Sequence, residues 1–204
     1  MQARYLTKLV IATDDERIFA AAKDFGALVQ MTHPDHISGT DRVAEVASAD
    51  SANIIVNIQG DEPLIDPAAI DAAIFTVIDE THVPMGTLMR RINDPVEIAN
   101  PNVVKVVADL RGNAIYFSRS PIPFVREGAV AHYQNIGLYV YEREFLLQYS
   151  DMPVGPLERA EKLEQLRALE NGYRIRVAET EYESIGVDTP EDLERVAALF
   201  AAST

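Results

Sequence analysis

The sequence predicts one α/β domain over residues 1–204, with a doubly wound, mostly parallel sheet. Short apolar runs of strand length alternate with helical segments along the chain, an order that places helices on both faces of a sheet. The run Asn53–Ile58 contains three consecutive apolar residues, which is typical of a strand covered on both faces. No linker rich in glycine, serine or proline interrupts the alternation, so a single domain is expected.

The ends of the elements are predicted from residues that favour helix starts and strand ends. Asp14 and Asp15 follow the first strand, and Pro67 suits the first position of a helix. Thr189 is expected to cap the last helix, with the acidic residue Asp192 three positions on. We expect strands over residues 8–13, 53–58, 103–107, 136–141 and 174–178, and helices over residues 16–25, 41–49, 67–80 and 156–170 and from residue 190 onward.

The composition narrows the possible functions. Eighteen basic and thirty-two acidic residues give a formal net charge of −14, which argues against a nucleic-acid-binding protein. The absence of cysteine excludes disulfides, thiolate nucleophiles and cysteine zinc sites. The chain shows no signal peptide and no apolar stretch of membrane-spanning length, so we expect a cytoplasmic protein without membrane insertion. A nucleotide bound by so acidic a chain would need a divalent cation.

Two acidic residues follow buried strands, where ligands bind in open α/β sheets. Asp61 comes directly after the strand over residues 53–58, and Asp188 precedes the last helix. Carboxylate oxygens suit magnesium, and a metal held by both could orient the phosphates in a nucleotidyl transfer. Each residue also has a simpler interpretation: Asp61 as part of a turn, and Asp188 as one of the aspartates that commonly occur beside helix caps.

A third polar segment contains Ser38, Gly39 and Arg42. Small residues offer backbone donors and a guanidinium suits phosphate or base recognition, although the segment could equally be a loop that caps a helix, with Arg42 solvated. The four histidines lack metal-ligand spacing on one element, and the sequence contains no Walker loop, dinucleotide fingerprint or nucleophile elbow.

Five segments in register resemble the 3-deoxy-manno-octulosonate cytidylyltransferase family, also called CMP-Kdo synthetases. The segments are Asp35–Arg42, Asn57–Pro63, Asn100–Lys105, Tyr116–Arg119 and Gly186–Asp192, and the resemblance runs from about Lys8 to the last helix. It implies a nucleotide-diphospho-sugar transferase-like fold and a homodimer. It also implies a magnesium-dependent reaction in which CTP and 3-deoxy-manno-octulosonate (Kdo) give CMP-Kdo and pyrophosphate for lipopolysaccharide biosynthesis.

The resemblance also implies roles for individual residues. Asp61 and Asp188 would hold Mg²⁺ and serve catalysis. The nucleotide would be surrounded by Ser38, Gly39, Arg42 and Gln59, and the sugar acid by Arg119, Tyr139, Glu164 and Gln165. Simpler interpretations remain for the last four, namely a surface arginine, a packed tyrosine and two solvated helix residues.

Two departures from the family leave alternatives open. The chain begins at what matches the family's second strand, so roughly 30 residues, a strand-helix unit with its phosphate loop, are not matched. Asn135 stands where the family has a histidine facing the sugar, which leaves the identity of the sugar acid open. The alternatives are a cytidylyltransferase for another 2-keto sugar acid, sialic-acid-like or 8-amino-Kdo, and an inactive nucleotide-sugar-binding remnant.

Overall fold

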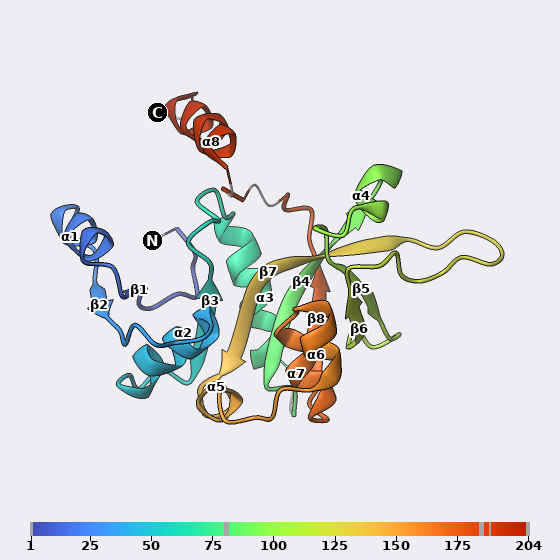
Figure 1. Ribbon diagram of the computed structural model, residues 1–204, viewed down its shortest axis with the longest axis horizontal. Coiled ribbons are helices and arrows are strands. Elements are labelled where there is room, and N and C mark those ends of the chain that lie inside the picture. The colour runs from blue at the N-terminus through green and yellow to red at the C-terminus, as the bar shows by residue number, and fades with distance from the viewer. Residues whose placement is uncertain (1, 80–81, 184–185, 188, 203–204) are drawn as a thin grey trace.

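The centre of the molecule is a six-stranded sheet built around one long strand, β7 (His132–Glu142) (Figure 1). The structure is a computed structural model that describes residues 2–79, 82–183, 186–187 and 189–202. The other strands of this sheet are β3 (Ile54–Ile58), β4 (Met85–Ile92), β5 (Lys105–Ala108), β6 (Ala114–Ser118) and β8 (Ile175–Glu179). The predicted strands over residues 53–58, 103–107, 136–141 and 174–178 are all present with shifted ends.

The strand directions correct one part of the predicted fold class. β7 is antiparallel to β3, β4 and β5, and β4 and β8 form the parallel pair of this sheet. The α/β class is confirmed, but most neighbouring strands pair antiparallel and the sheet is mixed. The apolar pattern of a strand indicates that it is buried, and it does not indicate the direction in which the strand runs.

A second, two-stranded sheet lies apart from the first, at the left of Figure 1. β1 (Ile11–Thr13) and β2 (Val29–Met31) pair in parallel, and α1 (Glu16–Asp24) packs beside them. The strand expected over residues 8–13 is therefore shorter than predicted. It is also only partly buried, because in the described part of the chain it pairs with β2 alone.

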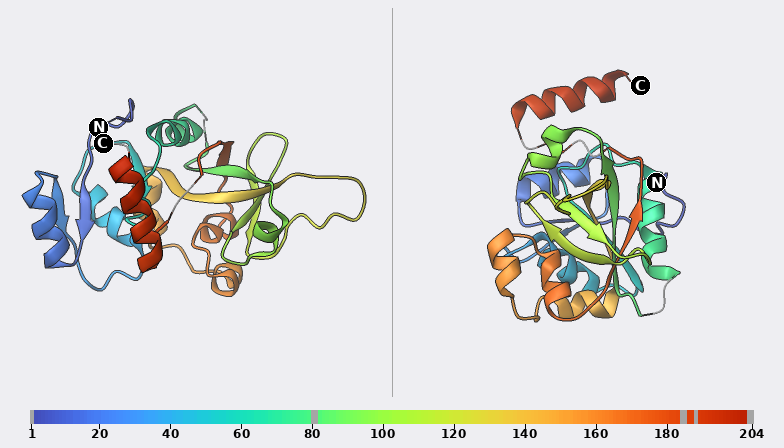
Figure 2. Two further views of the ribbon diagram at one scale, coloured as in Figure 1. Left: turned by 90° about the horizontal axis from the view of Figure 1, so that it is seen from above. Right: turned by 90° about the vertical axis from the view of Figure 1, so that its right-hand side faces the viewer.

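Helices cover both faces of the large sheet, as a doubly wound fold requires, and Figure 2 shows the two layers edge-on. α3 (Pro67–Ile78) packs on one face, against Leu88, Ile136 and Leu138. The opposite face carries α2 (Gly39–Ser48), α5 (Arg143–Tyr149) and α7 (Gln165–Glu170), and the remaining helices are α4 (Pro95–Ala99), α6 (Pro156–Glu161) and α8 (Pro190–Ala202). Of the helices that the structure describes, none has the length and apolar character that crossing a bilayer requires.

The helix expected over residues 156–170 is broken into α6 and α7. Lys162, at the end of α6, has a left-handed backbone with φ 55° and ψ 48°, which ends the helix after Glu161. The apolar residues Leu163 and Leu166 are buried as the pattern predicted. Their spacing continues across the break, so periodicity alone could not reveal it.

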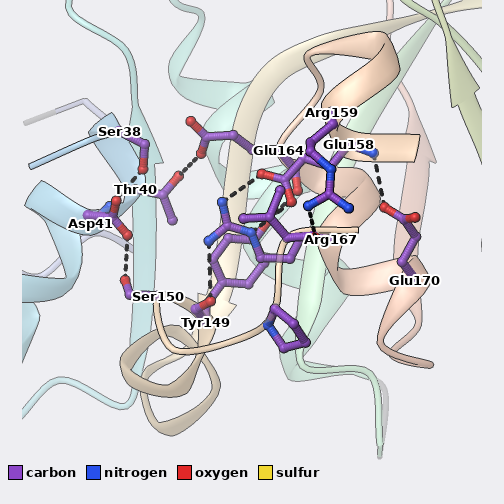
Figure 3. Close-up of polar contacts among 12 residues, drawn as sticks. Ser38, Thr40, Asp41, Tyr149, Ser150, Glu158, Arg159, Glu164, Arg167 and Glu170 are labelled. Carbon is purple, nitrogen blue, oxygen red and sulfur yellow. Dashed lines mark hydrogen bonds and ion pairs between the residues drawn. The ribbon is translucent and has the colours of Figure 1, made fainter. Parts of the chain in front are cut away.

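A buried ion pair holds the two short helices together (Figure 3). Arg167 on α7 donates from Nη2 and Nε to the two carboxylate oxygens of Glu158 on α6, at 2.6 and 2.9 Å. Only 10% of the Arg167 side chain and 9% of the Glu158 side chain are exposed. The guanidinium also lies over the ring of Tyr149, 5.0 Å from its centroid. Both charges are therefore satisfied only while they face each other.

We expect Arg167→Met to lower the free energy of unfolding by about 3–5 kcal/mol, because it leaves the Glu158 carboxylate buried without its cation. The double variant Arg167→Met/Glu158→Leu should recover much of this loss, since it removes both charges. Urea denaturation of the three proteins measures these differences. A double variant no more stable than the single one would contradict the explanation.

Candidate active site

Several of the candidate residues lie on or beside β7. Ile58, the last residue of β3, pairs with Leu138, whereas Lys105, the first residue of β5, pairs with Gln134. Because β4 occupies the other edge of β7, β3 and β5 share one edge and leave a short interval between their facing ends. A Cβ built on Gly137, within this interval, would meet no other part of the protein within 4 Å. The face of β7 at Gly137 is therefore open.

The predicted nucleotide segment lies against the residue that follows β3. A Cβ on Gly39 would lie 3.2 Å from Oε1 of Gln59, so the backbone of Gly39 and the Gln59 carboxamide are in contact. Nε2 of Gln59 donates to Oδ1 of Asn57 at 3.2 Å, which orients the carboxamide. The Ser38 hydroxyl accepts from the N–H of Asp41 at 3.2 Å and caps α2. The structure thus brings Ser38, Gly39 and Gln59 together.

Arg42 points from α2 toward the small sheet. Its Nη2 lies 3.0 Å from a carboxylate oxygen of Asp14, and its Nη1 donates to the hydroxyl of Thr32. Asp14 and Thr32 each follow the last residue of a strand, β1 and β2 respectively. The alternative of a solvated Arg42 is therefore wrong, because the side chain is mostly buried and fixes α2 to the ends of both strands.

The two acidic segments predicted from separate strand ends lie side by side. The N–H of Val187 donates to the backbone carbonyl of Asp61 at 2.9 Å. Asp61 itself is exposed, while Glu62 accepts a hydrogen bond from the Tyr182 hydroxyl at 3.1 Å. Asp188 lies outside the described residues, so its distance from Asp61 stays a prediction.

The predicted cap of the last helix is confirmed. The N–H of Asp192 donates to the Thr189 hydroxyl at 3.2 Å, and the N–H of Thr189 donates to the Asp192 carboxylate at 3.0 Å. Each side chain therefore satisfies a backbone N–H of the other at the start of α8.

Asn135 is the centre of a buried hydrogen-bond network on β7. Its Oδ1 accepts from the Tyr139 hydroxyl at 2.6 Å and from Nε2 of Gln165 at 3.3 Å. Its Nδ2 donates to the Thr87 hydroxyl at 3.0 Å and to the carbonyl of Leu88 at 3.2 Å. Asn135 is only 8% exposed, so its amide orients two predicted sugar-acid residues.

The environment keeps Tyr139 neutral. Burial raises the pKa of Tyr139 well above its ordinary value, and the negative charge of Glu164 adds to the effect. Its hydroxyl therefore remains a hydrogen-bond donor. The expectation that Gln165 could be solvated on its helix is wrong, because the break at Lys162 turns this residue into the network.

Glu164 joins the two predicted halves of the site. The Thr40 hydroxyl on α2 donates to Oε2 of Glu164 at 2.8 Å, and the Tyr149 hydroxyl donates to the Glu164 backbone carbonyl (Figure 3). Burial, with the negative charges of Asp41 and Glu158, raises the pKa of Glu164 against the opposing effect of the Thr40 bond. Thr40 was not predicted as a site residue, and the signal that could have indicated it was its position beside Ser38 and Gly39.

Arg119 binds backbone carbonyls rather than lying free at the surface. Its Nε donates to the carbonyl of Glu161 at 2.7 Å, Nη1 to that of Pro101 at 3.1 Å and Nη2 to that of Lys162 at 3.5 Å. These bonds use only part of the guanidinium donor set, and the side chain remains partly exposed. Close by, Lys105 is fully buried, and burial and the charge of Arg119 lower its pKa.

The described residues contain no group of three or more His, Asp or Glu side chains that could hold a metal. The predicted metal pair, however, includes Asp188. The donor chemistry that the structure does describe fits magnesium, because Asp61 offers an exposed carboxylate and the chain just before Asp188 is bonded to the Asp61 backbone.

Comparison with known proteins tests the resemblance found in the sequence. A family model described as cytidylyltransferase matches residues 1–177. The 3-deoxy-manno-octulosonate cytidylyltransferase of Solibacter usitatus (strain Ellin6076) is 70% identical over 203 residues, which cover 98% of this chain and 81% of that protein. The chain belongs to this cytidylyltransferase family.

Further comparisons agree with the family assignment. The 3-deoxy-manno-octulosonate cytidylyltransferase of Geobacter sulfurreducens (strain ATCC 51573 / DSM 12127 / PCA) is 56% identical over 207 residues, 96% of this chain and 83% of the relative. A solved CMP:2-keto-3-deoxy-manno-octonic acid synthetase, complexed with CTP, has a TM-score of 0.93 and 40% identity over 100% of this chain and 86% of that one. The predicted family and the predicted α/β nucleotidyltransferase-like fold are thus confirmed, apart from the strand directions corrected above.

The raised pKa of Glu164 predicts a pH-dependent effect on stability. The folded protein holds the Glu164 proton more tightly than the unfolded chain, so stability from this group is lost as the pH rises from the ordinary value of 4.5 through the raised pKa. We expect Glu164→Gln, which keeps an oxygen for Thr40, to gain stability relative to wild type across that interval. Urea denaturation of both proteins from pH 4 to pH 8 measures the difference, and a difference that does not change with pH would refute the assignment.

Proposed function

We propose that this cytidylyltransferase transfers CMP from CTP to Kdo, giving CMP-Kdo and pyrophosphate for lipopolysaccharide biosynthesis. The observation that carries the proposal is the convergence of two sets of residues on the interval beside Gly137. Gly39 and Gln59 are in contact on one side, the Asn135 network lies on the other, and the bond between Thr40 and Glu164 joins them. The name of the Solibacter usitatus relative supports the same reaction.

The nucleotide is assigned to the side formed by Ser38, Gly39, Arg42 and Gln59. Gly39 has no side chain, so a ligand can approach its backbone closely. The Gln59 carboxamide offers both a donor and an acceptor, which suits the edge of a base. Arg42 holds the start of α2 in place through its bonds to Asp14 and Thr32.

The sugar acid is assigned to the side formed by Arg119, Tyr139, Glu164 and Gln165. A guanidinium with donors to spare suits the carboxylate that a 2-keto sugar acid carries. The Tyr139 hydroxyl and the Gln165 carboxamide suit sugar hydroxyls. Asn135 is neutral at every pH, whereas the histidine that the family has at this position can carry a positive charge. The alternative within the same reaction class is therefore a sialic-acid-like or 8-amino-Kdo substrate.

Magnesium is assigned to Asp61 and Asp188. When bound, the ion would neutralise phosphate charge and polarise the phosphoryl oxygens. The chain itself orients both substrates, so that the sugar hydroxyl and the α-phosphate of CTP meet in a reactive geometry. An inactive nucleotide-sugar-binding remnant is the alternative from another class.

The test is the release of pyrophosphate from CTP with Mg²⁺ and a panel of sugar acids: Kdo, 8-amino-Kdo and a sialic acid. We expect release with Kdo, and a decrease of more than about a hundredfold for Asp61→Asn, since a metal supplies several kcal/mol and each 1.4 kcal/mol is tenfold in rate. Asp66→Asn is the matched control, because asparagine also caps a helix and Asp66 caps α3.

Three outcomes would count against the proposal. Release with another sugar acid in preference to Kdo would change the substrate. Equal activity of Asp61→Asn and wild type would refute the role of Asp61. No release with any sugar acid would favour the inactive remnant.

We also propose that the protein is a cytoplasmic homodimer, which the cysteine-free chain and several exposed apolar side chains support. The connection between β6 and β7 projects from the molecule (Figure 1) and carries Phe124, 88% exposed, and Val130. Leu110 and Ile115 are exposed on the neighbouring strands and turn.

We expect Phe124→Asp to convert a dimer to a monomer, because burying a carboxylate in an apolar interface is costly. Light scattering coupled to gel filtration measures the mass. Leu28→Asp, at an exposed apolar residue beside β2, is the control that should keep the wild-type mass. A monomeric wild type would reject the dimer.

A further inference from the structure

The end of β6 and the end of α6 hold each other by hydrogen bonds in both directions. The Glu161 carboxylate accepts from the Ser118 hydroxyl at 2.6 Å and from the N–H of Arg119 at 3.0 Å. The Arg119 guanidinium in turn donates to the backbone carbonyls of Glu161 and Lys162. We call these four residues the Glu161–Arg119 clamp.

The clamp lies at the break between α6 and α7. Lys162 has a positive φ there, a conformation that is unfavourable for a residue with a side chain and persists only where its surroundings hold it. Arg119 bonds the carbonyl of Lys162 itself and the carbonyl just before it. Glu164 and Gln165 follow within three residues, so their direction depends on this turn.

Other contacts fix α6 and α7 to each other. Arg167 pairs with Glu158, and the Glu170 carboxylate accepts from the N–H groups of Leu157 and Glu158, both at 2.9 Å. The clamp differs because it bonds the turn between the helices to the sheet. Arg119 extends it through Pro101 to the loop before β5.

The Glu161 carboxylate is charged when it acts in the clamp. Burial alone would raise its pKa, but the hydrogen bonds from Ser118 and the Arg119 N–H, with the charge of Arg119, hold the pKa below its usual value. Glutamine at this position could offer only one accepting oxygen to these two donors.

We propose that Glu161 is a positioning residue for the sugar-acid side of the site. Its carboxylate accepts from the backbone N–H of Arg119, and its carbonyl accepts from the Arg119 guanidinium. These bonds fix the turn from which Glu164 and Gln165 reach Thr40 and Asn135. The inference rests on the proposed function. The described contacts of the clamp do not include Ser38, Gly39, Arg42 or Gln59, so its loss should affect the sugar acid and not CTP.

The first experiment measures steady-state kinetics of Glu161→Ala and Glu161→Gln. We expect the KM for Kdo to rise by roughly tenfold in Glu161→Ala and by less in Glu161→Gln, since tenfold corresponds to about one hydrogen bond to a charged group. The KM for CTP should stay near the wild-type value. Glu170→Gln is the matched control: it makes the same charge change in the same helix pair and should lower stability without raising the KM for Kdo.

The second experiment does not depend on turnover. Amide hydrogen exchange should be faster at residues 162–166 and at Arg119 in Glu161→Ala than in wild type and in Glu170→Gln. An unchanged KM for Kdo, an equal rise in both KM values, or unchanged exchange would overturn the inference. If wild type releases no pyrophosphate with any sugar acid, the proposed function fails, and the exchange measurement alone decides whether Glu161 holds the turn.

Discussion

The architecture of the site depends on one constraint, namely that each position along an edge of β7 can pair with only one strand. β3 takes the half of this edge that includes Leu138, and β5 takes the half that includes Gln134. The chain must leave the sheet after β3, so Gln59 and the acidic segment behind it emerge at the interval. Asn135 and Tyr139 flank the same interval from β7 itself. Residues from distant parts of the chain therefore meet here because of strand pairing.

Glu158 and Glu161 differ from Glu164 in the partners of their carboxylates. The first two hold parts of the fold together, whereas Glu164 links the two halves of the candidate site. Glu158 has Arg167 as its partner, and Glu161 has the Arg119 backbone N–H and charge. Glu164 instead accepts from a neutral hydroxyl, and burial raises its pKa. A carboxylate held in this way is costly to the fold, so its position is better explained by ligand binding than by stability. In an acidic chain, such a site needs compensating positive charge, and the Arg119 guanidinium is bonded to the turn that precedes Glu164.

Most helices and strands, and the segments of the candidate site, could be predicted from the sequence, because local signals mark where such elements begin and end. Apolar runs located β3 and β8, and Thr189 with Asp192 located the start of α8. Local signals could not predict three features: the direction of β7, the break at Lys162 and the position of Asn135 at the centre of a hydrogen-bond network. Each depends on contacts with residues far away in the sequence, such as Thr87 for Asn135. A pattern of hydrophobic residues does not indicate which distant residues will be in contact.

The bond between Thr40 and Glu164 fixes the distance between the start of α2 and the turn before α7. Thr40 belongs to the start of α2, where we propose that the nucleotide binds, and Glu164 to the turn before α7, where we propose that the sugar acid binds. Transfer between two bound substrates requires the attacking and accepting atoms to be held close and aligned, and a direct bond between the two binding elements limits their relative movement. Arg42 holds α2 to the small sheet, and the Glu161–Arg119 clamp holds the turn to the large one. Both members of the Thr40–Glu164 pair are thus held to a sheet, so the fold itself sets the distance between the two proposed binding elements.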